Sequence, residues 1–103
     1  MAHIDAADLL PAERIREGVL AGEVTQLHRG DAHATEGDTF EIRGEEFEVI
    51  DVTERRLGEV TDADARAEGS ADLAAYRERI ERTHGTEWDD DHTAVRHRFE
   101  RRD

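Results

Sequence analysis

Two runs of alternating apolar and polar residues, joined by a tight turn, constrain the fold of this chain more than any other feature. The first run covers residues 39–43, the turn lies at Gly44-Glu45, and the second run begins at Glu46. The apolar positions are Phe40, Ile42, Phe47 and Val49. A period of two is typical of strands that bury one face. This segment is therefore predicted to form a β-hairpin.

The alternation shifts by one residue at Val49-Ile50, after which Ile50 and Val52 continue the new phase. A shift of one residue moves every later side chain to the other face of a sheet. We therefore expect either a β-bulge at this point or a strand that is covered on both faces.

The segment before the hairpin predicts a helix followed by a strand. Pro11 opens the helix, where its missing N–H costs little. Ile15 and Val19 then lie four residues apart, and Gly22 ends the helix. The extended run Val24–Arg29 follows. Residues 1–10 are predicted to form a loosely ordered lead-in.

The segment after the hairpin predicts two more helices and a last strand. Thr61 is a candidate N-cap for a short helix over Asp62–Glu68, and Ser70 is the expected cap of a longer helix that ends near Gly85. The apolar face of this longer helix comprises Leu73, Tyr76 and Ile80. The acidic residues 87–91 are expected to form a loop, and Thr93–Phe99 alternates as a strand.

These elements together predict an α+β fold, a small mixed sheet or barrel flanked by about three helices. Residues 11–103 have the length of one ordinary domain. The chain contains no cysteine, which excludes disulfides and zinc–thiolate sites.

The charge balance points to an environment of high salt. The formal net charge is −13, and all 14 basic residues are arginine. Self-repulsion of this size destabilises a compact state in dilute buffer, whereas molar salt screens charges within about 3 Å. We therefore predict a halophilic source. In such a protein only a local cluster of arginines, and not the overall sign of the charge, bears on nucleic-acid binding.

Several functional classes are not expected. No apolar run approaches the roughly 20 residues that cross a bilayer, and no signal segment opens the chain, so a soluble cytoplasmic protein, monomeric by default, is predicted. The six histidines show no metal-ligand spacing, and the acidic run before His92 is expected to be a solvated loop. No metal and no cofactor are predicted.

Four local motifs, in this order and spacing, resemble the ASCH domain of the PUA-like superfamily over nearly all of the chain after Leu10. The first follows the family form G-x-K-x-x-T-x-R. Gly22 stands at the glycine and Arg29 at the arginine, but Val24 occupies the lysine position and Leu27 the threonine position. The other three motifs are Glu36–Phe40, Ala67–Ser70 and Phe99-Glu100. The resemblance implies a small PUA-like β-barrel.

The resemblance also implies a choice between binding and hydrolysis. Similar small enzymes hydrolyse N4-acetylcytidine with a lysine, a threonine and a glutamate, of which this chain keeps only Glu68. We therefore predict a non-catalytic binding module for RNA or a modified nucleoside. The first alternative is a divergent amidohydrolase that uses Glu68 and Thr25, although His28, its candidate base, faces away from Thr25 on a strand. The second is a protein-interaction or regulatory domain.

The predicted ligand-binding residues are Arg29, Glu68, Gly22, Gln26 and Trp88. Arg29 suits a phosphate or the edge of a base, and Trp88 suits stacking on a nucleobase. Ion pairing of Arg29 and packing of Trp88 are the alternatives, while Tyr76 and His97 are expected inside the protein. The only basic cluster is the candidate phosphate contact, unless glutamates neutralise it. Its members are Arg96, Arg98, Arg101 and Arg102.

Overall fold

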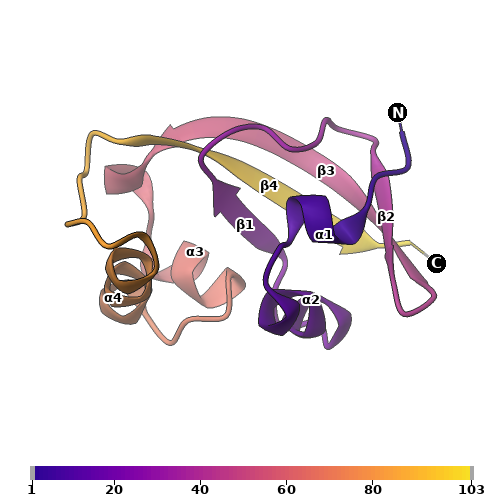
Figure 1. Cartoon of the computed structure of the whole chain (residues 1–103), viewed down its shortest axis with the longest axis horizontal. Helices are drawn as coiled ribbons and strands as arrows, with labels where there is room; N and C mark the ends of the chain where they lie inside the picture. The colour runs from indigo at the N-terminus through magenta and orange to yellow at the C-terminus, as the bar shows by residue number, and fades with distance from the viewer. Residues whose placement is uncertain (1, 103) are drawn as a thin grey trace.

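A computed structural model describes residues 2–102 and shows an α+β fold built on one antiparallel sheet. The helices are α1 (Ala6–Leu9), α2 (Glu13–Leu20), α3 (Asp62–Ala67) and α4 (Leu73–His84), with a short 3-10 turn at Leu57–Glu59. The strands are β1 (Gln26–Arg29), β2 (Thr39–Ile42), β3 (Glu45–Arg56) and β4 (Thr93–Arg101). Figure 1 shows the helices on the inner side of the arc that β3 and β4 form.

The sheet is a curled half-barrel with the strand order β1-β4-β3-β2. All three strand pairs are antiparallel, so the sheet is not mixed. A parallel pairing is found outside these strands, as an isolated bridge between His3 and Thr39. The predicted α+β class and helix-flanked β architecture are confirmed.

The predicted hairpin and its irregularity are both present. β2 pairs with β3 across the turn at Arg43-Gly44, with Phe40 opposite Phe47. The register between β3 and β4 shifts between Val49 and Asp51, which identifies the phase change as a β-bulge. Its extra residue, Ile50, is 43% exposed. The long β3 can therefore bend around the core without turning later apolar residues outward.

The lead-in differs from its prediction as a loosely ordered segment. Asp5 caps α1 by accepting a hydrogen bond from the Ala7 N–H, and Leu9 and Leu10 are fully buried. The backbone also joins the sheet, because the Ile4 N–H donates to the Thr39 carbonyl at 2.8 Å. A single turn of helix shows no periodicity in the sequence, so only its packing reveals its place in the core.

Two hydrophobic clusters divide the interior. The larger joins α1 and α2 to the sheet and includes Phe40, whose ring contacts the rings of Phe47 and Phe99. The smaller lies between α3, α4 and the loop after α4. Its buried members are Val60, Ala65 and Tyr76, and Leu73, Ile80 and Trp88 pack against it.

The caps of α3 and α4 set where the polar residues of this region lie. Thr61 caps α3 as predicted and forms a capping box with Asp64. The cap of α4 is Asp72 and not Ser70, because the Asp72 carboxylate accepts from the Ala75 N–H at 2.8 Å. The Ser70 N–H instead completes the C-terminal turn of α3 by donating to Ala65. Gly85 ends α4 in the left-handed region.

Candidate ligand pocket

A fully buried carboxylate, Glu68, organises the polar interior between β1, α3 and α4. One of its oxygens accepts from the His28 backbone N–H at 3.1 Å and from the Tyr76 hydroxyl at 3.0 Å. The other accepts from His28 Nδ1 at 2.7 Å and from Gln26 Nε2 at 3.0 Å. Four donors compensate the loss of water that burial of a carboxylate entails. Glu68 is therefore a structural anchor.

Local backbone geometry brings Glu68 to this position. It is the C-cap of α3, and Gly69 follows in the left-handed region at φ +87°. The Thr25 N–H donates to the Ala67 carbonyl at 2.8 Å, which fastens the end of α3 to the start of β1. A side chain at Gly69 would also crowd Val24, at 3.3 Å. The Ala67–Ser70 motif thus packs a helix end against a strand.

Alternation along β1 decides which side chains meet Glu68. Gln26 and His28 point to one face and both contact the carboxylate. Arg29 leaves on the other face, where its Nη1 donates to the carbonyls of Asp8 and Leu9 at 3.1 and 2.7 Å. Arg29 and Glu68 therefore do not face one another across a cleft.

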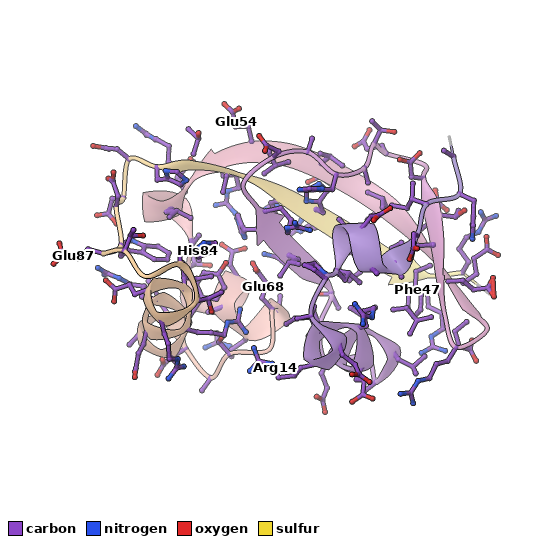
Figure 2. All side chains as sticks on the ribbon, in the orientation of Figure 1. Arg14, Phe47, Glu54, Glu68, His84 and Glu87 are labelled. Atoms are coloured by element: carbon purple, nitrogen blue, oxygen red, sulfur yellow. The ribbon has the colours of Figure 1, made fainter. Side chains whose placement is uncertain are left out.

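A pocket of about 530 Å³ lies directly beside this network. This volume falls within the range of small-molecule sites. Its walls come from the end of β1, from α4, and from the loop after α4. The lining residues that bear on chemistry are His28, Arg29, Tyr76, Ile80, His84 and Trp88. In Figure 2, Glu68 lies between the helices and the sheet, while His84 sits at the end of α4.

His28 links the anchor to the pocket. Its side chain is only 3% exposed, and its Nδ1 is held by Glu68. The other ring nitrogen, Nε2, is buried and has no hydrogen-bond partner within residues 2–102. An unpaired buried polar atom costs about 1–3 kcal/mol, and such an atom requires a specific explanation.

Two titratable neighbours of Glu68 keep fixed protonation states. Burial raises the pKa of the Tyr76 hydroxyl, and the adjacent Glu68 carboxylate raises it further, so Tyr76 remains a donor. Burial alone would raise the pKa of Asp64, but hydrogen bonds from Thr61 and Gln26 outweigh it and lower the pKa to about 2. Asp64 accepts from Gln26 Nε2 at 3.1 Å and so fixes the orientation of that amide.

Trp88 forms an aromatic wall of the pocket. Its ring meets that of Tyr76 edge to face at a centroid separation of 6.1 Å, and the Arg77 guanidinium lies 5.2 Å from its centroid. Its Nε1 donates to Asp90 at 2.7 Å. The predicted ligand residue Trp88 is therefore at the pocket, and it also packs against Tyr76.

Two other predicted ligand residues, Gly22 and Gln26, lie outside this pocket. Gly22 is exposed beyond the end of α2 and lines neither pocket described here. Gln26 is buried in the Glu68 network and, with Thr25, borders a second, shallower pocket of about 330 Å³. Val24, at the position of the family lysine, is buried in the larger core cluster, and Leu27 packs against it.

The candidate phosphate-contact cluster is largely neutralised. Arg96 pairs with Asp51 at 3.1 Å, and Arg101 pairs with Glu45 at 3.0 Å. Arg102 lies within 4 Å of both Glu46 and Glu48. Arg98 instead donates from Nε to the Gln26 amide oxygen at 3.4 Å. The cluster does not present a row of unpaired cations.

The sequence identified Glu68 and Trp88 as candidate ligand residues. It gave His28 a conditional role as a base and, on the strand face that it shares with Gln26, a less favoured role in ligand contact. Two signals pointed to His28: it shares a strand face with Gln26, and it alternates with the apolar Leu27.

Within residues 2–102 no three histidine, aspartate or glutamate side chains gather as a metal site. In the same range, no helix is both long and apolar enough to traverse a bilayer.

Comparison with known proteins supports the fold. No family model and no curated protein matches the sequence. Among solved structures, an ASCH domain from Lactobacillus crispatus JV V101 matches with a TM-score of 0.67 and 20% identity, over 97% of this chain and 77% of that one. A DUF984 protein from Enterococcus faecalis V583 matches with a TM-score of 0.58 and 15% identity, over 99% of this chain and 75% of that one. This protein therefore has an ASCH-like fold.

Proposed function

We propose that this protein is a non-catalytic binding module that takes the base of a nucleoside, or of an RNA nucleotide, into the pocket beside His28. The observation that carries the proposal is a pocket of about 530 Å³ whose lining includes His28, a residue whose buried Nε2 has no hydrogen-bond partner within residues 2–102. Tyr76 and Trp88 add aromatic surface to the same pocket. A planar ligand with a polar edge matches both features.

The chemistry of the neighbouring positions supports binding over hydrolysis. The amine and hydroxyl of the resembling enzymes are replaced by Val24 and Leu27, both of which pack in the core. The anchor Glu68 has all four of its hydrogen bonds within the protein. It therefore holds His28 and has no acceptor site left for a reacting group.

Recognition is proposed to rest on the base and not on the phosphate backbone. The candidate phosphate cluster is paired with carboxylates or bonded to Gln26, and the formal net charge is −13. Binding through many phosphates would release counterions and weaken steeply with salt. Binding through the base is expected to change little between 0.2 and 2 M KCl.

Trp88 provides a direct assay because it is the only tryptophan of the chain and lines the pocket. Nucleosides and short single-stranded RNAs would be titrated at both salt concentrations, with excitation at 295 nm. We expect saturable quenching of the Trp88 fluorescence by at least one nucleoside. Amide chemical shifts at His28 and Gly30 would locate the contact.

A matched pair of variants assigns the contact to the pocket. Ile80→Ala removes part of its wall, whereas Ile50→Ala truncates the exposed residue at the bulge, outside this pocket. Ile80→Ala is expected to weaken binding at least about fivefold, and Ile50→Ala is expected to leave it unchanged. The proposal fails if no nucleoside or RNA alters either the fluorescence or the amide shifts.

Hydrolysis is the second candidate, and the His28–Glu68 pair favours it. A carboxylate on Nδ1 fixes the imidazole, and a neutral Nε2 can accept a proton from an attacking water. Incubation with N4-acetylcytidine, followed by chromatography for cytidine, separates the two functions. Turnover that disappears in His28→Phe would replace the binding proposal with this one.

A further inference from the structure

We infer that His97 is a pH-sensitive latch, which holds residues 30–34 against the sheet while its imidazole is neutral and releases them when the ring is protonated. These residues follow β1 on the connection that Figure 1 shows arching from β1 toward β2. The first of them, Gly30, lines the pocket beside His28. The latch therefore places one part of the pocket wall under the control of a proton, whichever ligand the pocket takes.

A single described hydrogen bond attaches residues 30–34 to the rest of the protein. The His33 N–H donates to His97 Nε2 at 3.0 Å. No other backbone or side-chain hydrogen bond within residues 2–102 involves these five residues. They form no helix or strand, and Ala34 is the buried side chain among them, whereas the other four residues are exposed. The attachment of this segment thus depends on one imidazole nitrogen and one methyl group.

The direction of this hydrogen bond fixes the state of the His97 ring. A backbone N–H can only donate, so Nε2 carries a lone pair and the imidazole is neutral. An imidazolium carries a proton on both nitrogens and has no acceptor. Protonation of His97 therefore replaces the hydrogen bond to His33 with two N–H groups that face each other.

The surroundings of His97 do not compensate a charge on its ring. The side chain is fully buried, and its register neighbours are Leu27 on β1 and Val52 on β3. Its Nδ1 is also buried and has no hydrogen-bond partner within residues 2–102. The ion pairs described in the same range include none with His97. An imidazolium at this position would be neither hydrated nor paired, which is costly.

The charged neighbours of His97 also oppose its protonation. They are His33 on the released segment, whose ring centroid lies 6.4 Å away, and Arg29 at the end of β1. Burial, His33 and Arg29 together lower the pKa of His97, although the carbonyls of Leu27 and Val95 act in the opposite direction. The latch is therefore fully closed above pH 6.5 and opens as the pH falls through the folded-state pKa.

The segment is expected to yield before the sheet does. Release of residues 30–34 costs one hydrogen bond and one buried methyl group, and it admits water to the charged ring. Separation of β4 from β3 would instead break a ladder that extends from Phe47 to Arg56. Local opening of this kind is the response of the least strongly held part of a structure.

Hydrogen exchange of the backbone amides, followed by NMR between pH 7.5 and 4.5 in 2 M KCl, tests the latch on the unmodified protein. Each rate is divided by the intrinsic rate at the same pH, and the His97 ring is titrated through its carbon shifts. The protection of the His33 amide is expected to fall at least about tenfold with the midpoint of the His97 titration. The amide shifts of Gly30 and His33 should change with that midpoint, while amides paired between β3 and β4 stay protected.

Two variants assign the release to the His97 ring. His97→Phe removes the acceptor, so the His33 amide should exchange rapidly at every pH. His33→Ala keeps the backbone N–H but removes the second ring that titrates nearby, and the amide of residue 33 should still lose protection as His97 is protonated. If His97→Phe does not fold, as judged by circular dichroism, His33→Ala and the unmodified protein still decide the question.

Four results would overturn the inference. The first is protection of the His33 amide that does not follow the titration of His97. The second is loss of protection at the same pH across β3 and β4, which would mean that the whole domain unfolds. The third is a His97 ring that stays neutral down to pH 4.5. The fourth is disappearance of the release in His33→Ala, which would assign it to the His33 ring.

Discussion

Replacement of Glu68 by glutamine is expected to lower the free energy of unfolding by about 3 kcal/mol. The carboxylate accepts two hydrogen bonds on each oxygen, and an amide keeps only one oxygen. If the NH2 group replaces the oxygen near Tyr76, the tyrosine hydroxyl can rotate to accept, but the His28 backbone N–H cannot. If it replaces the other oxygen, His28 can change tautomer, but the Gln26 amide is held by Asp64.

Either orientation of the amide leaves one buried donor without an acceptor. Such a donor costs about 1–3 kcal/mol. The two retained bonds also change from charge-assisted to neutral, a loss of roughly 0.5–1 kcal/mol each. The sum is a substantial share of the 5–15 kcal/mol that stabilises a domain of this size. The prediction thus follows from the number of donors around Glu68.

Urea denaturation followed by Trp88 fluorescence and circular dichroism measures this loss. Glu54→Gln is the matched control, because it removes the same charge from an exposed position on the outer side of β3 (Figure 2). With a slope of about 1–3 kcal/mol per molar urea, the midpoint of Glu68→Gln should fall by roughly 1–3 M, while Glu54→Gln should hardly move. If the two variants unfold within about 1 kcal/mol of each other, the reasoning about the anchor is wrong.

Three further predictions concern pH, salt and packing. Burial lowers the pKa of His97 below the ordinary 6.5. The neutral imidazole therefore contributes fully to the free energy of unfolding above pH 6.5, and this contribution is lost as the pH falls from 6.5 toward the folded-state pKa. Thermal unfolding of His97→Gln should depend less on pH between 7.5 and 5.5 than that of the unmodified protein, and an unchanged slope would contradict this cause. The net charge of −13 predicts that the melting temperature rises by roughly 5 °C or more between 0.1 and 2 M KCl, and no rise would contradict the view that self-repulsion limits stability. Gly18→Ala would place a methyl group 2.6 Å from Val24 Cγ2 and should lower the free energy of unfolding by about 1–3 kcal/mol. Gly30→Ala is the control, because its added methyl group meets open space and should leave the free energy of unfolding nearly unchanged. Equal urea midpoints for the two variants would show that the Val24 side chain moves aside at little cost.

The local features of the fold could be predicted from the sequence because they depend on near neighbours. The hairpin follows from alternation, the bulge from the change of phase at Ile50, and the start of α3 from the capping residue Thr61. The N-cap of α4 was predicted incorrectly, because Ser70 and Asp72 are both residue types that commonly cap helices. The backbone of Ser70 belongs to the last turn of α3, so Asp72 takes the role.

The site was predicted only in part. Alternation correctly separates Gln26 and His28 from Arg29, but it does not say which of the two faces meets α3. The hydrogen bond between the Thr25 N–H and the Ala67 carbonyl decides this, because it docks the end of α3 beside Gln26 and His28. Glu68 was identified by its motif, whereas its four donors appear only in three dimensions.

The sequence by itself determined which residues form strands, which side chains share a face, and that the family amine and hydroxyl are absent. Tertiary structure alone decided that Leu9 and Leu10 are buried and that the C-terminal arginines are paired. It also decided that His28, which lines a pocket, has a buried nitrogen without a hydrogen-bond partner within residues 2–102. Periodicity reports on residues a few positions apart. The partner of a buried polar atom can lie 40 positions away in the chain, as Glu68 does from His28, and only the packing of whole elements selects it.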